Sequence, residues 1–488
     1  MGIGVDNPAL HSPEQMLKTL VVNSPRRSPP PTPAASLAIH AAVLLLWLGL
    51  FAAPFRLHGI WVWSAGLVYV AYDTVLLGFT FWATLPLLRA RAAHVIGDER
   101  PTLAVIVAAH NEALVLPITL AALLGQSDRP DMIVIADDGS SDATAAVLKA
   151  QYGLEPPAIG AITTGSDGLA WLRLPHGGKA QSMNAAMALI DCDVVLTVDA
   201  DTLLEADAIA AVRAGFAAES GLVATTGVLI PVCAPTVTGR IFQWFQTYEY
   251  IRNFLSRYAW MGQDSLLLIS GAFAGFRRTA VIEVGGFDAD CLVEDYELIH
   301  RLKRYSAVHN LGWTTRVLGN AKARTEAPSA PMPFLRQRRR WFGGFLQTQY
   351  WYRDMVGSRR FGALGLAHLP VKAIDTLQPV YGLTAFFLLC WYGATGTVAV
   401  LAPVVAVIGI KIVIDLAFHL WSVQLYRRWL GDGTLAAPGW ALLAAILEPF
   451  SFQLLRHASA VWGWQMVLAG RQTWGGQERT GALGSDAA

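Results

Sequence analysis

The sequence Val194-Val195-Leu196-Thr197-Val198-Asp199-Ala200-Asp201 decides the fold. Its short, apolar and β-branched run predicts a buried strand that ends at two carboxylates, Asp199 and Asp201. Open α/β sheets bind ligands at the carboxyl ends of their strands, so both aspartates should face a ligand crevice. Such close carboxylates repel each other unless a cation lies between them, and Mg²⁺ or Mn²⁺ prefers carboxylate and phosphate oxygens. The alternative is structural: Asp201 caps a helix over residues 203–214.

The composition is that of a membrane protein with a water-soluble portion. Of 488 residues, 54% are hydrophobic and 15% are charged, and the mean hydropathy is +0.40, whereas soluble proteins carry about a quarter charged residues. The net charge of +1 gives no indication of nucleic acid as a partner. The chain has four cysteines without a Cys-x-x-Cys spacing, which we expect to be reduced and structural: Cys192, Cys233, Cys291 and Cys390.

The N-terminal part of the chain divides into a polar tail and an apolar hairpin. Residues 1–34 are polar and proline-rich, which predicts a disordered tail. Residues 35–88 hold two apolar runs with a short connection, which predicts a hairpin of two transmembrane helices. Basic residues flank this hairpin on both sides, and the positive-inside tendency then places both flanks in the cytoplasm. These residues are Arg26, Arg27, Arg89 and Arg91. We therefore predict a multi-pass protein of the inner (plasma) membrane whose soluble domain is cytoplasmic.

Residues 100–342 differ from their neighbours, because short apolar strands alternate there with amphipathic segments. This alternation predicts an α/β domain. Two further strands are expected at residues 103–109 and 132–136, and acidic residues follow both of them. We assign these acids to the same crevice as Asp199: Glu112 after the first strand, and Asp137 and Asp138 after the second. Turn and helix-cap roles for the two aspartates are the structural alternative.

After the α/β domain the chain becomes apolar again. Residues 343–372 mix aromatic and basic side chains, which predicts amphipathic helices at a membrane surface. Residues 373–470 predict three or four transmembrane helices, and residues 471–488 form a polar C-terminal tail.

Three short motifs supply further candidate site residues. Gly177-Gly178-Lys179 precedes a helical run, where glycine lets the backbone approach phosphate and the lysine adds charge. Glu294-Asp295 begins another helical run, and its acids either complement the helix dipole or provide a general base. The basic cluster Gln337-Arg338-Arg339-Arg340-Trp341 lies where the domain meets the membrane. It suits a membrane anchor, or a diphosphate clamp with a platform for a sugar.

In their order along the chain, these motifs resemble the inverting, membrane-integrated family 2 glycosyltransferases, which include cellulose, hyaluronan and poly-N-acetylglucosamine synthases. The resemblance covers about residues 100–345 and implies a GT-A nucleotide-sugar-binding domain inserted between transmembrane helices. By this resemblance Asp137 and Asp138 bind uridine, Lys179 lies along the nucleotide sugar, and Asp199 and Asp201 hold the nucleotide and its metal. Asp295 is then the catalytic base, and Ser270, Gly271 and Glu294 belong to the diphosphate and acceptor side. The resemblance further implies that Gln337, Arg340 and Trp341 mark processive members. One departure is Val293, where the family has threonine.

The resemblance implies transfer of sugar from UDP-N-acetylglucosamine or UDP-glucose to a growing polysaccharide, with Mg²⁺ or Mn²⁺ as cofactor. Translocation of the polymer through the membrane helices is expected, and an accessory export or regulatory protein is a further expected partner. The alternative is a non-processive enzyme that moves one sugar to a lipid or short acceptor. A transporter or scaffold that merely binds nucleotide is disfavoured, because it has no need of three aspartates in one crevice. No domain of the cyclic-di-GMP-binding type follows the membrane helices, which argues against cellulose as the product.

Overall fold

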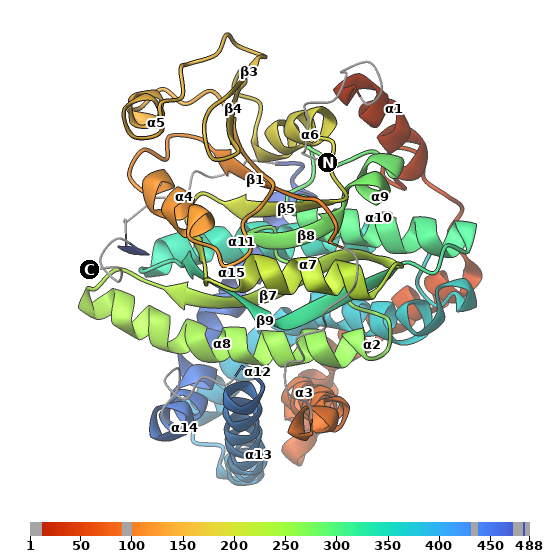
Figure 1. Ribbon diagram of the computed structural model, residues 1–488. Coiled ribbons are helices and arrows are strands. Elements are labelled where there is room, and N and C mark those ends of the chain that lie inside the picture. Colours follow the sequence, from red (N-terminus) through yellow and green to blue (C-terminus); the bar gives the residue numbers. More distant parts are fainter. Residues whose placement is uncertain (1–11, 90–99, 431–437, 472–481, 484–488) are drawn as a thin grey trace.

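The computed structural model describes residues 12–89, 100–430, 438–471 and 482–483 (Figure 1). Arg91 and most of the predicted C-terminal tail therefore lie outside the described residues. Within the described residues, nine strands form one mixed sheet in the order β3-β4-β2-β1-β5-β8-β7-β9-β6. Their bounds are β1 Leu103–Ala109, β2 Met132–Asp137, β3 Ile162–Thr164, β4 Leu169–Arg173, β5 Val194–Asp199, β6 Thr202–Leu204, β7 Leu222–Val232, β8 Phe273–Arg277 and β9 Thr314–Glu326. The predicted α/β class is confirmed.

Alternation along the buried strands divides the core between the two faces of the sheet. In β1, Val105 and Val107 point to one face, whereas Ala104 and Ile106 point to the other. The first face is covered by α4 (Leu116–Leu124), α5 (Thr144–Tyr152) and α7 (Ala208–Ala218). The second face is covered by α6 (Lys179–Leu189), α8 (Val237–Met261), α9 (Arg278–Glu283), α10 (Glu294–His309) and α11 (Pro331–Trp351). Figure 1 shows α8 running along the sheet beside β7 and β9.

The expectation of a disordered tail over residues 1–34 is wrong for its described part. Helix α1 (Pro13–Asn23) begins at a Ser12 cap, where the Ser12 hydroxyl accepts a hydrogen bond from the Gln15 N–H. Met16 and Leu20, four residues apart on one face, are buried against the domain. The proline-rich composition concealed this short amphipathic stretch.

Within the part of the chain that the structure describes, four helices are long and apolar enough to cross a membrane. They span Ala34–Arg56, Gly59–Leu88, Leu364–Ala394 and Val398–Trp429. In element terms these are α2 (Ala34–Arg56), η1 (Gly59–Trp63) with α3 (Ser64–Thr84) and η2 (Leu85–Leu88), η4 (Leu364–His368) with α12 (Leu369–Ala394), and α13 (Val398–Leu430). Figure 1 shows α3 and α13 projecting from the side of the domain where α8 lies. These helices indicate a membrane protein.

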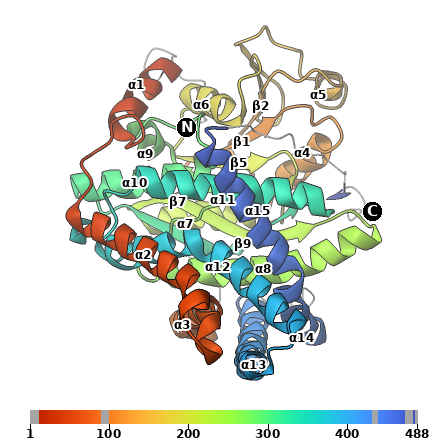
Figure 2. The same cartoon turned by 180° about the vertical axis from the view of Figure 1, so that it is seen from behind.

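The remaining C-terminal helices are shorter. They are α14 (Pro438–Leu447), η5 (Glu448–Phe450) and α15 (Phe452–Leu468), and α15 packs along α11 and α12 (Figure 2). The number of C-terminal membrane crossings therefore stays a prediction. The expected boundary at residue 342 is displaced, because α11 continues through it to Trp351. In the segment expected to form interfacial helices, the end of α11 is followed by the short η3 (Arg359–Phe361) and η4 and by the start of α12.

Candidate active site

Strand pairing brings the predicted acidic residues to one edge of the sheet. β1 pairs in parallel with both β2 and β5, with Ala109 opposite Asp137 and Ala108 opposite Asp199. The residues after the three strands consequently emerge side by side. Asp201 does not cap a helix, because β6 follows it directly and α7 begins only at Ala208.

A cavity of about 1250 Å³ opens at this edge. Twelve of the thirteen predicted site residues line it: Glu112, Asp138, Lys179, Asp199, Asp201, Ser270, Gly271, Glu294, Asp295, Gln337, Arg340 and Trp341. Asp137 is the exception. Its buried carboxylate accepts hydrogen bonds from the Ser140 N–H at 2.8 Å and the Trp171 indole N–H at 3.2 Å. Both oxygens thus have partners beneath the cavity, a position that suits the structural turn role better than direct contact with a ligand.

Asp138 shapes the loop that leads into α6. Its carboxylate accepts the backbone N–H of Gly177 at 2.8 Å and that of Gly178 at 2.9 Å. Gly178 has a φ of +94°, a conformation that side-chain-bearing residues rarely adopt, and α6 begins at the next residue. The turn therefore sets Lys179 at the first position of the helix with its side chain in the cavity.

Lys179 links the two acidic segments of the site. Its ammonium contacts the Asp199 carboxylate and lies 4.0 Å from Glu294 Oε1 and 3.3 Å from the Gly271 carbonyl oxygen. Burial alone would lower the pKa of Lys179, but the charges of Asp199 and Glu294 hold it above its ordinary value. Burial raises the pKa of Glu294, against the opposing effect of Lys179. Lys179 is therefore a fixed positive charge between the ends of β5 and α10.

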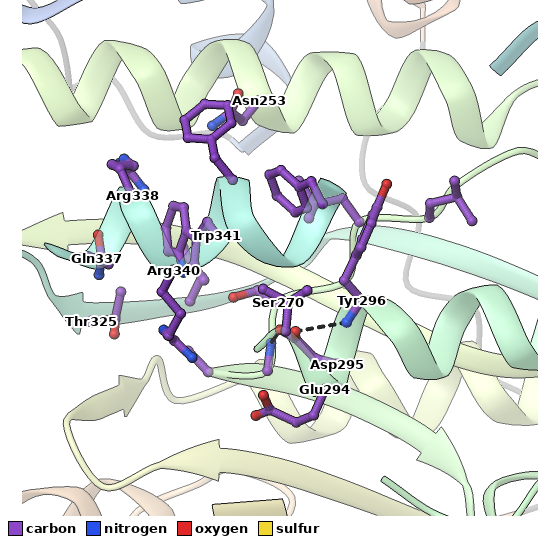
Figure 3. A pocket seen from close by; sticks show the side chains of 18 of the residues that line it. Asn253, Ser270, Glu294, Asp295, Tyr296, Thr325, Gln337, Arg338, Arg340 and Trp341 are labelled. Atoms are coloured by element: carbon purple, nitrogen blue, oxygen red, sulfur yellow. Dashed lines mark hydrogen bonds between the residues drawn. The ribbon is translucent and has the colours of Figure 1, made fainter. Parts of the chain in front are cut away.

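Asp295 is held in place by backbone groups (Figure 3). Its Oδ2 accepts the Gly271 N–H at 2.6 Å, and its Oδ1 accepts the Tyr296 N–H at 2.8 Å. A Cβ on residue 271 would lie only 2.9 Å from Oδ2, so glycine is needed for this approach. The carboxylate lies at the start of α10, where the helix dipole favours negative charge. This geometry suits a general base.

Helix α11 presents the basic cluster to the cavity (Figure 3). Arg340 donates to the Leu292 carbonyl oxygen at 3.4 Å, close to the start of α10. The guanidinium of buried Arg338 lies 4.0 Å from the centre of the Trp341 ring, and donates to Glu249 Oε2 at 2.7 Å. The buried Gln337 Oε1 has no hydrogen-bond partner among the described residues. A buried amide oxygen without a partner costs free energy, which a ligand hydroxyl would recover.

Two groups of cavity residues were missed from the sequence. His110 and His176 stack with ring centroids 4.3 Å apart, and with Asp138 they form a metal-ligating type of cluster whose ligand atoms all lie within 4.8 Å of one another. His176 directly precedes the Gly177-Gly178-Lys179 motif, and His110 lies two residues before Glu112. Glu249 and Arg257 of α8 also line the cavity, and no local sequence signal identifies them. Burial lowers the pKa of Arg257 to about 10.

The cavity continues from the sheet edge toward the apolar helices. Beyond Trp341 its lining includes Gln378 of α12 and Gln453, Arg456 and His457 of α15. These polar side chains lie on helices that are otherwise largely apolar. The cavity therefore reaches polar side chains on α12 and α15 as well as the acidic site.

Comparison with known proteins finds similarity to glycosyltransferases. Residues 194–414 match the family model described as glycosyl transferase family group 2. A probable glycosyltransferase of Bacillus subtilis, YdaM, is 28% identical over 265 residues, which cover 50% of this chain and 56% of that protein. Poly-β-1,6-N-acetyl-D-glucosamine synthases of Staphylococcus aureus are 27% identical over 249 residues, covering 51% of this chain and 55% of theirs. The alignments thus span about half the length of these curated relatives.

A solved structure shares the fold. It is the mannosyltransferase PcManGT from Pyrobaculum calidifontis in complex with GDP-Man and Mn²⁺, with a TM-score of 0.51 and 20% identity, covering 80% of this chain and 99% of that chain. This likeness bears on the architecture, and together with the mixed sheet it identifies the domain as GT-A.

Proposed function

We propose that this chain, which carries a family 2 glycosyltransferase domain, transfers sugar from a UDP-sugar to the end of a growing polysaccharide with inversion. The donor proposed first is UDP-N-acetylglucosamine, because the poly-N-acetylglucosamine synthases are among its relatives, and the second is UDP-glucose. The catalytic domain is proposed to be cytoplasmic and the polymer to leave through the membrane helices.

One observation carries the proposal. A single cavity joins the strand-end acids Asp138 and Asp199, the candidate base Asp295, the aromatic ring of Trp341 and the polar residues of α15. In the proposed reaction the strand-end acids would serve the nucleotide, Asp295 the reacting sugar, and Trp341 with the polar residues of α15 the extending acceptor. A polar chain can cross hydrocarbon only along a path lined by protein.

The proposed chemistry uses one base. Asp295 takes the proton of the acceptor hydroxyl, the hydroxyl oxygen attacks the anomeric carbon, and the bond from that carbon to the diphosphate oxygen breaks on the opposite face. General-base assistance of this kind contributes roughly 10²- to 10⁴-fold in rate. Lys179 lies where it can offset charge on the leaving diphosphate, and Arg340 is a further cation on the cavity wall. Trp341 would stack on the acceptor sugar.

The site residues fit a divalent cation. Asp199 and Asp201 follow one strand, line the cavity and supply the carboxylate oxygens that Mg²⁺ and Mn²⁺ prefer. When bound, the cation would neutralise charge on the leaving diphosphate. The cluster of His110, Asp138 and His176 is a second donor set, but its carboxylate already accepts two backbone N–H groups. We therefore assign the cation to the Asp199–Asp201 pair, and expect Asp201→Asn to abolish metal-dependent turnover and His176→Ala to retain it.

The test uses the full chain in nanodiscs with Mg²⁺ or Mn²⁺. UDP-N-acetylglucosamine, UDP-glucose, UDP-glucuronate and GDP-mannose are offered separately, nucleotide release is followed and the product is sized. A long polymer from one UDP-sugar is the expected result. Asp295→Asn should retain UDP binding and lose turnover, while Asp167→Asn in an exposed loop should keep both. Turnover with GDP-mannose alone, or an Asp295→Asn variant as active as wild type, would overturn the assignment.

The second candidate is non-processive transfer to a lipid or short acceptor. It is supported by the membrane helices, which would also serve a lipid substrate. Trp341→Ala separates the two candidates. It should abolish long product if the enzyme is processive, and it should leave a single transfer largely intact if it is not.

A further inference from the structure

The loop over residues 284–293 leads directly into Glu294 and Asp295. The domain holds the start of this loop from two sides. Asn184 of α6 exchanges hydrogen bonds with the backbone of Phe287, both at 2.8 Å. Arg301 of α10 donates to the carbonyl oxygens of Val284 at 2.8 Å and Gly286 at 2.7 Å. The segment from Asp288 onward connects this fixed part of the loop to the candidate base, Asp295.

A third side of the loop is held by the N-terminal strap, which we define as residues 12–33. Figure 2 shows the chain descending from α1 along one side of the molecule, past α10, to α2. At the upper end, α1 packs against α6 and α9, and Met16 and Leu20 contact Gly286 and Gly285. Both glycines have a positive φ, and a side chain on either would collide with the strap. The loop is therefore shaped to receive α1.

Arg26 of the strap makes polar contacts with the 284–293 loop and packs against a ring of α11. One of its guanidinium nitrogens donates to both oxygens of Asp288, at 2.8 and 2.7 Å, and the other donates to Asp290 Oδ2 at 3.0 Å. Asp288 is 1% exposed, so this charge is buried against its partner. The same guanidinium lies 5.3 Å from the ring centre of Trp351. Arg353 beyond it donates to Thr32 Oγ1 at 2.8 Å.

These contacts join the two elements that carry the proposed chemistry. Asp288 belongs to the loop that sets the start of α10, and Trp351 ends α11, the helix that carries Arg340 and Trp341. Arg340 reaches the same loop through the Leu292 carbonyl oxygen. Arg26 thus connects the loop and α11 from outside the cavity, without lining it.

We propose that Arg26 is a positioning residue, which fixes the 284–293 loop against α11 and so sets Asp295 relative to the acceptor. The inference rests on the proposed function in one respect: the enzyme must turn over. It does not depend on which sugar is transferred. A misplacement of reacting groups by about 1 Å can cost on the order of 10²-fold in rate. Loss of Arg26 should therefore lower kcat while the donor, held by other elements, binds as before.

The experiment compares Arg26→Gln, Arg26→Lys, Asp288→Asn and the double variant Arg26→Gln/Asp288→Asn in full-length protein in nanodiscs. Arg27→Gln is the matched control, because among the described residues Arg27 forms an ion pair only with Asp290, which is exposed. Each variant is assayed for kcat and KM with the donor that wild type uses, for UDP affinity, and for amide hydrogen exchange of residues 284–293. Arg26→Lys retains the charge, and so keeps the test informative if the glutamine variant does not fold.

We expect Arg26→Gln and Asp288→Asn to lower kcat by about ten- to a hundredfold with KM and UDP affinity unchanged. Exchange in the loop should become faster, Arg26→Lys should recover part of kcat, and the double variant should lose no more than the worse single variant. Arg26→Gln with the kcat of Arg27→Gln would overturn the inference. So would a parallel loss of kcat and UDP affinity, since that indicates general damage. Absence of turnover in wild type would contradict the proposed function instead.

Discussion

Gly271 leaves little room for a side chain beside the candidate base Asp295. Its N–H donates to Asp295, and an added Cβ would meet three atoms of that side chain, at 2.9, 3.2 and 3.3 Å. Gly271→Ala should push the carboxylate by a few tenths of an ångström and lower kcat by about tenfold or more, because near-attack geometry is lost. The kcat and the UDP affinity of the variant are measured together, and we expect only kcat to change.

Gly262→Ala is the control for this substitution. A Cβ at residue 262 would lie 3.4 Å from the Ala259 carbonyl oxygen, which is an ordinary contact, and Gly262 is exposed. Its kcat should equal that of wild type. Equal activity of Gly271→Ala would show that Asp295 is not positioned through this approach.

His300 should make stability depend on pH. Burial lowers the pKa of His300 from 6.5 to about 4, with Lys372 adding to the effect, and the ring is 1% exposed between Tyr296 and Tyr352. The unfolded chain then binds more protons than the folded chain between pH 6.5 and about 4. Stability should therefore fall as pH drops through this window, by about 1.4 kcal/mol per pH unit.

Thermal unfolding at pH 7.0 and 5.0 measures this contribution. His300→Gln keeps an N–H for the Tyr296 carbonyl oxygen, which His300 contacts at 2.9 Å, but does not titrate. The difference in Tm between the two pH values should therefore shrink in His300→Gln. It should not shrink in His309→Gln, at the exposed end of the same helix. An unchanged difference in His300→Gln would assign the acid sensitivity to other groups.

Helix α11 depends on a buried ion pair for its place in the molecule. Arg338 is 1% exposed and donates to Glu249 of α8 at 2.7 Å. Arg338→Gln leaves that carboxylate buried without its closest cation, and breaking such a pair costs about 3–5 kcal/mol. We expect a clear loss of Tm, whereas Arg336→Gln, exposed on the same helix, should stay within about 0.5 kcal/mol. Equal Tm values for the two variants would mean that α11 is held by its apolar contacts alone.

The two sides of this pair also show what the sequence could predict and what it could not. Asp199, Asp201 and Asp295 were found because strand ends and helix starts are local patterns, and parallel pairing then brings them together. Glu249 and Arg338 are 89 residues apart, and the sequence around each of them does not indicate that they pair. Asp137 and Asp138 are adjacent in sequence, yet only the fold decides that one faces the core and the other faces the cavity.

The same limit applies to whole elements. The membrane-type helices and the α/β alternation follow from hydropathy and period, and both were predicted. Helix α1 was missed because its packing depends on two glycines of a distant loop, Gly285 and Gly286. Helix α8 was missed because its apolar side is spread over 25 residues among many polar ones. Such helices gain their stability from tertiary contacts rather than from their own sequence.

The catalytic domain and the membrane-type helices are joined through α8. This helix packs against α3, α13 and α14 as well as β7 and β9. Arg252 of α8 donates to both oxygens of Glu448, one of them at 2.6 Å, and lies 2.6 Å from His419 Nε2. The proposed acceptor path from the sheet edge to α15 requires the domain and these helices to keep a fixed relative position. The pair between Arg252 and Glu448 is a buried polar link between them.

Glu448→Gln should therefore destabilise the whole molecule rather than one part of it. The substitution leaves Arg252 largely buried without its carboxylate, and the expected cost is about 3–5 kcal/mol. Glu205→Gln is the matched control, because Glu205 pairs with Arg324 at 3.1 Å with both side chains exposed, and such pairs contribute about 0–1 kcal/mol. Thermal unfolding in one detergent should show a large Tm loss for Glu448→Gln only, with the signals of domain and membrane helices falling together. If the domain keeps its own Tm while only the helices melt earlier, α8 does not couple the two parts, and a continuous path for the acceptor would need another support.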